Sequence, residues 1–142
     1  MKRVDFYVLG QDGPDVDMRF ACRLTQQVYT RGQRVHLHVD DIDQAQRLDG
    51  LLWTFQDGSF VPHEVLGLSD DAAPVTIGAA VNLPDEADVL VNLASELPAA
   101  ADRFDRIAEI VTANPIQRNR SRERYRQYKA RGYTIETHTL DS

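Results

Sequence analysis

Short apolar runs alternate with segments of helical periodicity along this chain. Four runs are dominated by Val, Leu, Ile and aromatic residues: 4–9, 35–39, 75–77 and 89–93. Runs of this length and composition predict buried β-strands. Between the first two runs, apolar side chains recur every three or four residues from Met18 to Tyr29, and Gly32 follows as a helix stop. The chain therefore opens with a predicted β-α-β unit.

Two further helices are predicted before residue 115. Asp41, with Gln44 three residues later, resembles a capping box and begins a helix that runs to Trp53. Pro98 is predicted to begin the next helix, which Pro115 breaks or restarts. The apolar stripe of that helix consists of Phe104, Ile107, Ala108 and Val111.

A basic helix is predicted from Pro115 to the stop at Gly132, and residues 133–138 are predicted to form the last strand. Strands that alternate with helices predict a Rossmann-like, three-layer α/β/α sandwich with a mostly parallel sheet. The 142 residues, of which 42% are apolar, suit one domain spanning 1–142.

The composition of the chain indicates the cellular compartment in which the protein is expected. Polar residues interrupt every apolar run before it reaches the length of a membrane span or a signal peptide, so neither is expected. The single cysteine, Cys22, cannot form an intramolecular disulfide, and its helical setting predicts a buried core thiol. A cytoplasmic location is the default expectation.

Neither a nucleotide nor a metal is expected. The loop at 10–15, after the first strand, has no glycine-rich phosphate motif, and its aspartates would repel a pyrophosphate. His36, His38 and Asp40 alternate along a strand with the spacing of metal ligands, but Asp41 stands where a metal-dependent hydrolase carries another histidine. No catalytic constellation emerges from the sequence.

Charge is concentrated near the C-terminus. Residues 114–133 hold seven of the sixteen Lys and Arg residues and one acidic residue, so this segment carries +6 and the remainder −12 of a net −6. On a helix, Arg118, Arg122, Tyr125 and Lys129 line one stripe, with Tyr128 beside it. Two tyrosine rings flanking cations suit an acidic peptide that ends in an aromatic residue. Nucleic-acid phosphate and a simple solvated helix face are the alternatives.

A second constellation is aromatic. Trp53, Phe55 and Phe60 gather around a predicted turn at 57–58. Phe60 and Pro62 are predicted to lie in a loop, where exposed aromatic side chains favour a protein contact. Some of these residues must nevertheless belong to the core.

Taken in order, these segments resemble the chi subunit of bacterial DNA polymerase III. The resemblance runs nearly end to end and is carried by Phe6-Tyr7, 32–35, Leu48-Asp49, Leu52-Trp53, 59–63, 73–77, 90–93, 122–125, Tyr128 and Gly132-Tyr133. It implies a nucleotide-binding type of sandwich without a nucleotide site, which agrees with the loop at 10–15.

The resemblance also implies two partners. One is the acidic, phenylalanine-ended tail of single-stranded-DNA-binding protein, with contacts on Arg122, Tyr125 and Arg126. Arg118 flanks these contacts, and Lys129 continues the stripe. The other partner is the psi subunit of the clamp loader, with contacts carried over to three residues: Trp53, Phe60 and Pro62. The resemblance further implies a helicase of the iron–sulfur XPD type as a competitor for that surface in some relatives.

The expected function is therefore that of a non-enzymatic adaptor in DNA replication, without cofactor, metal, membrane or direct nucleic-acid binding. A module that binds single-stranded nucleic acid directly through the basic helix is the alternative. The acidic remainder of the chain opposes a long polyanion more than a short tail.

Overall fold

The structure is a computed structural model that describes residues 2–13, 15–55, 61–66, 73–79, 84, 87–98 and 101–140. Its strands are β1 (Arg3–Leu9), β2 (Val35–Val39), β3 (His63–Val65), β4 (Val75–Ala79), β5 (Val89–Asn92), β6 (Arg106–Val111) and β7 (Thr134–Leu140). Its helices are α1 (Val16–Thr30), α2 (Ile42–Thr54), the 3₁₀ turn η1 (Ala101–Arg103) and α3 (Pro115–Ala130).

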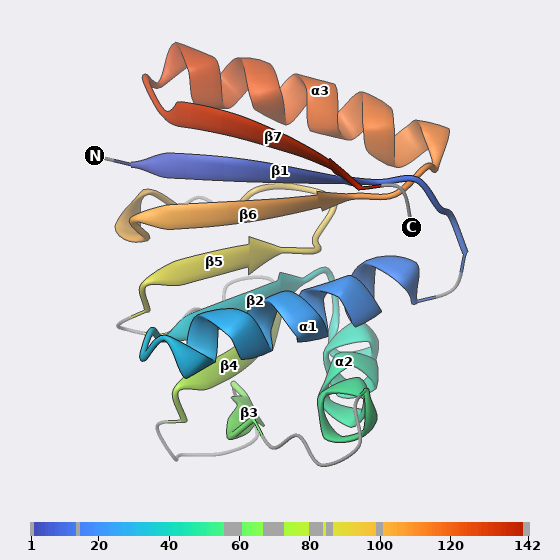
Figure 1. Cartoon of the computed structure of the whole chain (residues 1–142), viewed down its shortest axis with the longest axis vertical. Coiled ribbons are helices and arrows are strands. Elements are labelled where there is room, and N and C mark those ends of the chain that lie inside the picture. The colour runs from blue at the N-terminus through green and yellow to red at the C-terminus, as the bar shows by residue number, and fades with distance from the viewer. Residues whose placement is uncertain are drawn as a thin grey trace.

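The seven strands form one parallel sheet in the order β3-β4-β2-β5-β6-β1-β7 (Figure 1). One face packs under α1 and α2, where Leu37 and Leu48 lie in the larger core. The other face packs under α3 and η1, with Phe6 and Tyr128 in the smaller core. The predicted three-layer, Rossmann-like sandwich is confirmed.

Local signals explain why the helices begin and end where they do. The Asp41 carboxylate accepts the Gln44 N–H at 2.9 Å at the start of α2. Asn114 accepts two N–H groups at the start of α3, directly before Pro115. Gly32 and Gly132 follow α1 and α3 with φ of 82°, a backbone conformation that favours glycine.

The predicted helix from Pro98 is wrong. In the described part of this segment, the chain makes the short turn η1 and then enters β6, which pairs with β1 and β5 inside the sheet. Five consecutive residues of β6, from Ile107 to Val111, are buried because helices cover both faces. A strand covered on both faces has no alternating pattern, so its apolar positions also fit a helical spacing.

The histidines of β2 lie on the sheet face opposite Leu37. His36 is fully buried, its Nδ1 lies 2.8 Å from the Thr76 hydroxyl, and its ring stacks on Phe104 at 6.2 Å. Burial lowers the pKa of His36 to about 3, so the ring is neutral at pH 7. The His38 ring lies 5.7 Å from that of His36.

The core under α1 and α2 leads to the first testable prediction, which concerns the free energy of unfolding. Leu37→Ala empties a fully buried position on the central strand β2 and is expected to lower the free energy of unfolding by about 2–5 kcal/mol. Ile116→Ala, at a side chain that is 62% exposed, is the control and should change it by less than about 0.5 kcal/mol. Urea unfolding compares the two, and similar losses would contradict the assigned core.

Candidate protein-docking surfaces

A buried carboxylate fixes α3 to the sheet. Glu109 on β6 is fully buried and accepts a hydrogen bond from the Tyr128 hydroxyl at 2.6 Å and from the Asn92 amide at 3.2 Å. The Arg124 Nε lies 2.9 Å from the same carboxylate as an ion pair, and its NH1 donates to the Ser95 carbonyl at 2.9 Å. Burial raises the pKa of Glu109, and Arg124, Tyr128 and Asn92 oppose that rise.

These contacts correct one part of the predicted basic stripe. The spacing along the helix predicts that Tyr128 flanks the cations. Its side chain is instead fully buried, so it cannot do so. A helix turns by about 100° per residue, so Tyr128 lies beyond Tyr125 on the side that faces the sheet. Tyr125 is 40% exposed and is the ring of this pair that a partner can reach.

Exposed cations surround Tyr125 on the solvent side of α3. Arg118, Arg122, Arg126 and Lys129 are all exposed. Arg122 donates to the Asn119 side chain at 3.3 Å, and Arg126 pairs with Glu123 at 3.2 Å. Arg118 also donates through its Nε to the Thr112 carbonyl at 3.4 Å. Each of these three arginines makes one such contact among the described residues, so most of their guanidinium donors still face solvent. Partner binding by these residues stays a prediction.

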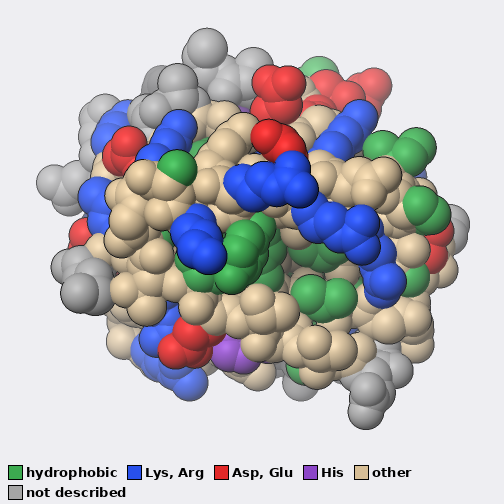
Figure 2. Space-filling model, turned by 90° about the horizontal axis from the view of Figure 1, so that it is seen from above, with side chains coloured by type: hydrophobic (Ala, Val, Ile, Leu, Met, Phe, Trp, Pro, Cys, Tyr) green, Lys and Arg blue, Asp and Glu red, His purple; other side chains and the backbone are tan. Residues whose placement is uncertain are grey.

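The apolar floor beside Tyr125 comes from β1. The Phe6 ring lies 5.7 Å from the Tyr125 ring and is only 3% exposed. Figure 2, seen from above the view of Figure 1, shows hydrophobic side chains in a hollow bordered by Lys and Arg. The sequence spacing within α3 could not reveal Phe6, because its position follows from how α3 packs across the parallel strands.

The opposite flank of α3 is also basic, but its cations serve the fold. Arg120, Arg124 and Arg131 line a hollow of about 450 Å³ against residues 95–98. Arg120 donates to the Ser95 hydroxyl at 3.0 Å, and Arg131 lies 3.7 Å from Asp102. Because these groups have acceptors within the chain, this flank is the weaker candidate for an anionic partner.

A carboxylate of the chain itself, that of Asp40, occupies the edge where parallel α/β sheets bind ligands. That edge lies at the carboxyl ends of the strands. There the Asp40 carboxylate accepts the Ser95 N–H at 2.8 Å and its hydroxyl at 2.7 Å. Asp40 thus occupies the Ser95 N–H and hydroxyl donors, which an anionic group of a ligand would need at this edge.

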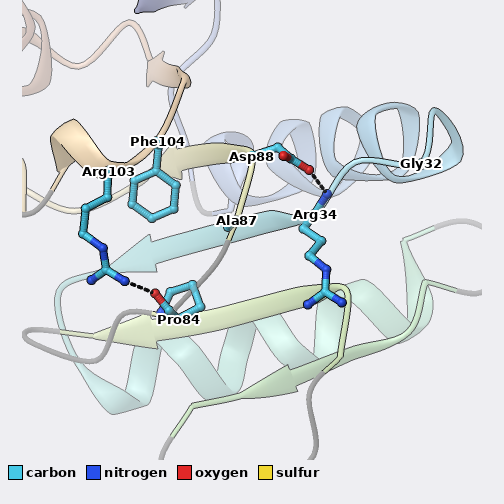
Figure 3. A pocket seen from close by; sticks show the side chains of 7 residues that line it. All are labelled: Gly32, Arg34, Pro84, Ala87, Asp88, Arg103 and Phe104. Atoms are coloured by element: carbon cyan, nitrogen blue, oxygen red, sulfur yellow. Dashed lines mark hydrogen bonds between the residues drawn. The ribbon is translucent and has the colours of Figure 1, made fainter.

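A further hollow opens at the amino end of the sheet (Figure 3). It has a volume of about 450 Å³, and its lining is Gly32, Arg34, Pro84, Ala87, Asp88, Arg103 and Phe104. The Asp88 carboxylate accepts the Arg34 N–H at 2.8 Å, and Arg103 donates to the Pro84 carbonyl at 2.7 Å. These bonds join the loops that precede β2, β5 and β6.

Among the described residues, one group has the spacing of metal ligands: Asp5, Glu136 and His138. Arg3 and Arg106 already bind the Asp5 carboxylate at 2.8 Å each. Burial alone would raise the pKa of Asp5, but hydrogen bonds from Arg3, His138 and Arg106 hold it below its usual range. Two guanidinium groups at this carboxylate oppose a metal cation.

The aromatic surface lies on α2 and at the start of β3. Trp53 is 54% exposed, and its ring lies 4.7 Å from the His63 ring. Pro62 is half-buried in the segment that enters β3. Phe60, the third predicted contact, lies outside the described residues. The structure therefore brings Trp53 close to the segment of Pro62 and leaves their role as a prediction.

Cys22 lies in the core, as predicted. It is fully buried in α1, and burial raises the pKa of its thiol to about 12. The thiol is therefore protonated and unreactive near neutral pH. Within the described part of the chain, no helix has the length and apolar composition to cross a membrane.

The fold defines a parallel, Rossmann-like α/β protein. It superimposes on the C-terminal domain of the DEAD-box protein Dbp5 with a TM-score of 0.59 and 14% identity, over 98% of this chain and 90% of that one. This likeness shows the fold alone.

Sequence comparison shows the family. Residues 1–136 match the family model of the DNA polymerase III chi subunit, HolC. The DNA polymerase III subunit chi of Pseudomonas aeruginosa is 38% identical over 140 residues, covering 99% of this chain and 98% of the relative. That of Escherichia coli is 30% identical over 145 residues, covering 98% and 99%. The chain belongs to the DNA polymerase III chi subunit family, which confirms the resemblance in its sequence.

The hydrogen-bond network around Glu109 leads to the second testable prediction, which also concerns the free energy of unfolding. Tyr128→Phe leaves a buried carboxylate oxygen without its closest donor and is expected to cost about 1–3 kcal/mol of unfolding free energy. Tyr133→Phe is the matched control, because the Tyr133 hydroxyl donates to Asp102 at the surface and should cost less. Equal losses in urea unfolding would contradict the buried network.

Proposed function

We propose that this chain is a non-catalytic adaptor of the replicative polymerase III assembly. It connects the psi subunit to the acidic C-terminal tail of single-stranded-DNA-binding protein in the cytoplasm. Membership of the chi family supports the replication role. The observation that carries the tail assignment is the exposed Tyr125 ring, which lies on Phe6 among solvent-facing cations.

The tail site works by charge and shape together. Arg122 supplies bidentate hydrogen bonds to a carboxylate of the tail, and Arg118, Arg126 and Lys129 attract the neighbouring acidic residues. The terminal aromatic side chain packs beside Tyr125. Glu123, the one acidic residue of α3, pairs with Arg126 and lines the hollow on the opposite flank, away from Tyr125.

The psi site is the aromatic surface of α2. Trp53 is a large, exposed ring of the kind that dominates binding energy at protein interfaces. Pro62 belongs to the same proposed contact, and Phe60 is kept as its third predicted residue although it lies outside the described ranges. A helicase of the XPD type is a competing occupant. α2 and α3 belong to different layers of the sandwich, so the two partners need not exclude each other.

Calorimetry with a synthetic acidic peptide ending in phenylalanine tests the tail site. Arg122→Ala is expected to weaken binding at least tenfold, since a hydrogen bond between charged groups contributes about 1.5–3 kcal/mol. Arg131→Ala removes the same charge from the opposite flank of α3 and should retain nearly full affinity. Wild-type affinity should fall as salt is added.

Equal weakening by both substitutions would show that net charge alone governs binding. Tight binding of bare single-stranded DNA in a gel shift, lost in Arg122→Ala, would instead favour the direct nucleic-acid-binding module.

A pull-down with purified psi tests the aromatic surface. Trp53→Ala is expected to lose psi, because truncating a central interface tryptophan commonly costs about 2 kcal/mol or more. Ile42→Ala, at another exposed apolar side chain of α2, is the control and should retain psi. Both variants should keep wild-type affinity for the tail peptide. Retention of psi by Trp53→Ala would remove this ring from the interface.

A further inference from the structure

A third surface lies between α1 and α2, away from Tyr125 and Trp53. The two helices pack side by side on the same face of the sheet (Figure 1). A hollow of about 420 Å³ opens between them, and its lining is Arg19, Arg23, Leu51, Thr54 and Phe55. Trp53 is two residues from Leu51 and Phe55, so it points to the other flank of α2.

The floor of this hollow is apolar. Leu51 and Phe55 are four residues apart along the helical path of α2, so their side chains lie on one line. Both are half-buried and pack against the core with one side, leaving the other side toward the hollow. An ion pair of 2.6 Å between Arg47 and Asp15 joins the two helices one turn before this floor.

The wall of the hollow is cationic. Arg19 and Arg23 are one turn apart on α1 and exposed. Within the described ranges, neither guanidinium has an ion pair or a side-chain hydrogen bond. This distinguishes them from Arg47 on α2 and from Arg120 and Arg124 on α3, whose donors serve the fold.

We propose that this hollow, the α1–α2 groove, binds an acidic amphipathic segment of a protein partner. One or two apolar side chains of that segment cover Leu51 and Phe55, and its carboxylates pair with Arg19 and Arg23. Charge complementarity selects an acidic occupant, because Arg19 and Arg23 offer two cations that have no ion pair among the described residues. The groove does not depend on the tail or psi assignments.

Other occupants fit less well. A nucleic-acid strand needs a longer row of cations along its phosphates, and the lining offers two guanidinium groups beside an apolar floor. A basic partner would meet both arginines. An acidic helix with apolar residues at four-residue spacing matches the floor and the wall together.

A pair of designed peptides tests this groove. The first is a 14-residue helix with Leu and Phe four residues apart and Glu at the flanking positions, and the second carries Lys at each Glu position. Fluorescence anisotropy is expected to give the Glu peptide at least tenfold higher affinity. Amide chemical shifts recorded by NMR should locate it on α1 and α2.

The charge-reversed double variant Arg19→Glu/Arg23→Glu should invert the preference, binding the Lys peptide at least tenfold more tightly than the Glu peptide. Arg31→Glu/Arg34→Glu makes the same charge change outside the groove and should keep the original preference. Thermal melting of each variant confirms that the fold is intact.

Three results would overturn the proposal: equal affinity for the two peptides, shifts confined to α3, or larger shifts of the same amides by an oligonucleotide. The acidic peptide ending in phenylalanine serves as an independent probe. It should bind the Arg19→Glu/Arg23→Glu variant with wild-type affinity, so failure of the groove and failure of the tail site are distinguishable.

Discussion

The buried carboxylate of Glu109 determines where α3 lies, and the surface of α3 depends on that position. Tyr128, Asn92 and Arg124 surround this one group, so a strand in the middle of the sheet fixes the angle and rotation of the helix. The Tyr125 ring then packs beside the Phe6 ring and stays partly exposed to solvent. A buried ionic group is costly unless every partner is present, which makes the network a constraint on rotation as much as a source of stability.

Some basic side chains bind acceptors elsewhere in the chain, whereas others have no such acceptor among the described residues and could bind a partner. Arg120 and Arg124 bind Ser95 and Glu109, and Arg47 binds Asp15. Arg19 and Arg23 have no such acceptor among the described residues. A count of charges along the sequence treats all of these alike, whereas the structure separates arginines with an acceptor inside the chain from arginines without one among the described residues.

Much of the fold could be predicted from the sequence because the signals were local. The apolar runs that form β1 and β2, and the helix cap at Asp41, can each be recognised from a few neighbouring residues in the sequence. β6 was mistaken for a helix because burial on both faces removes the alternation that marks a strand. The surface of α3 was only partly predictable, since the burial of Tyr128 depends on Glu109, nineteen residues away.

The separation of α2 and α3 by the sheet has a consequence for how the chain can join other molecules. If partners bind as proposed, occupants of opposite layers are separated by the sheet, so neither needs to change the intrinsic affinity of the other. Their coupling would then arise from tethering: once one is bound, the second is held at a high effective concentration. A rigid sandwich can therefore produce avidity without any conformational change, and its strength is set by the reach of the tethers and not by this fold.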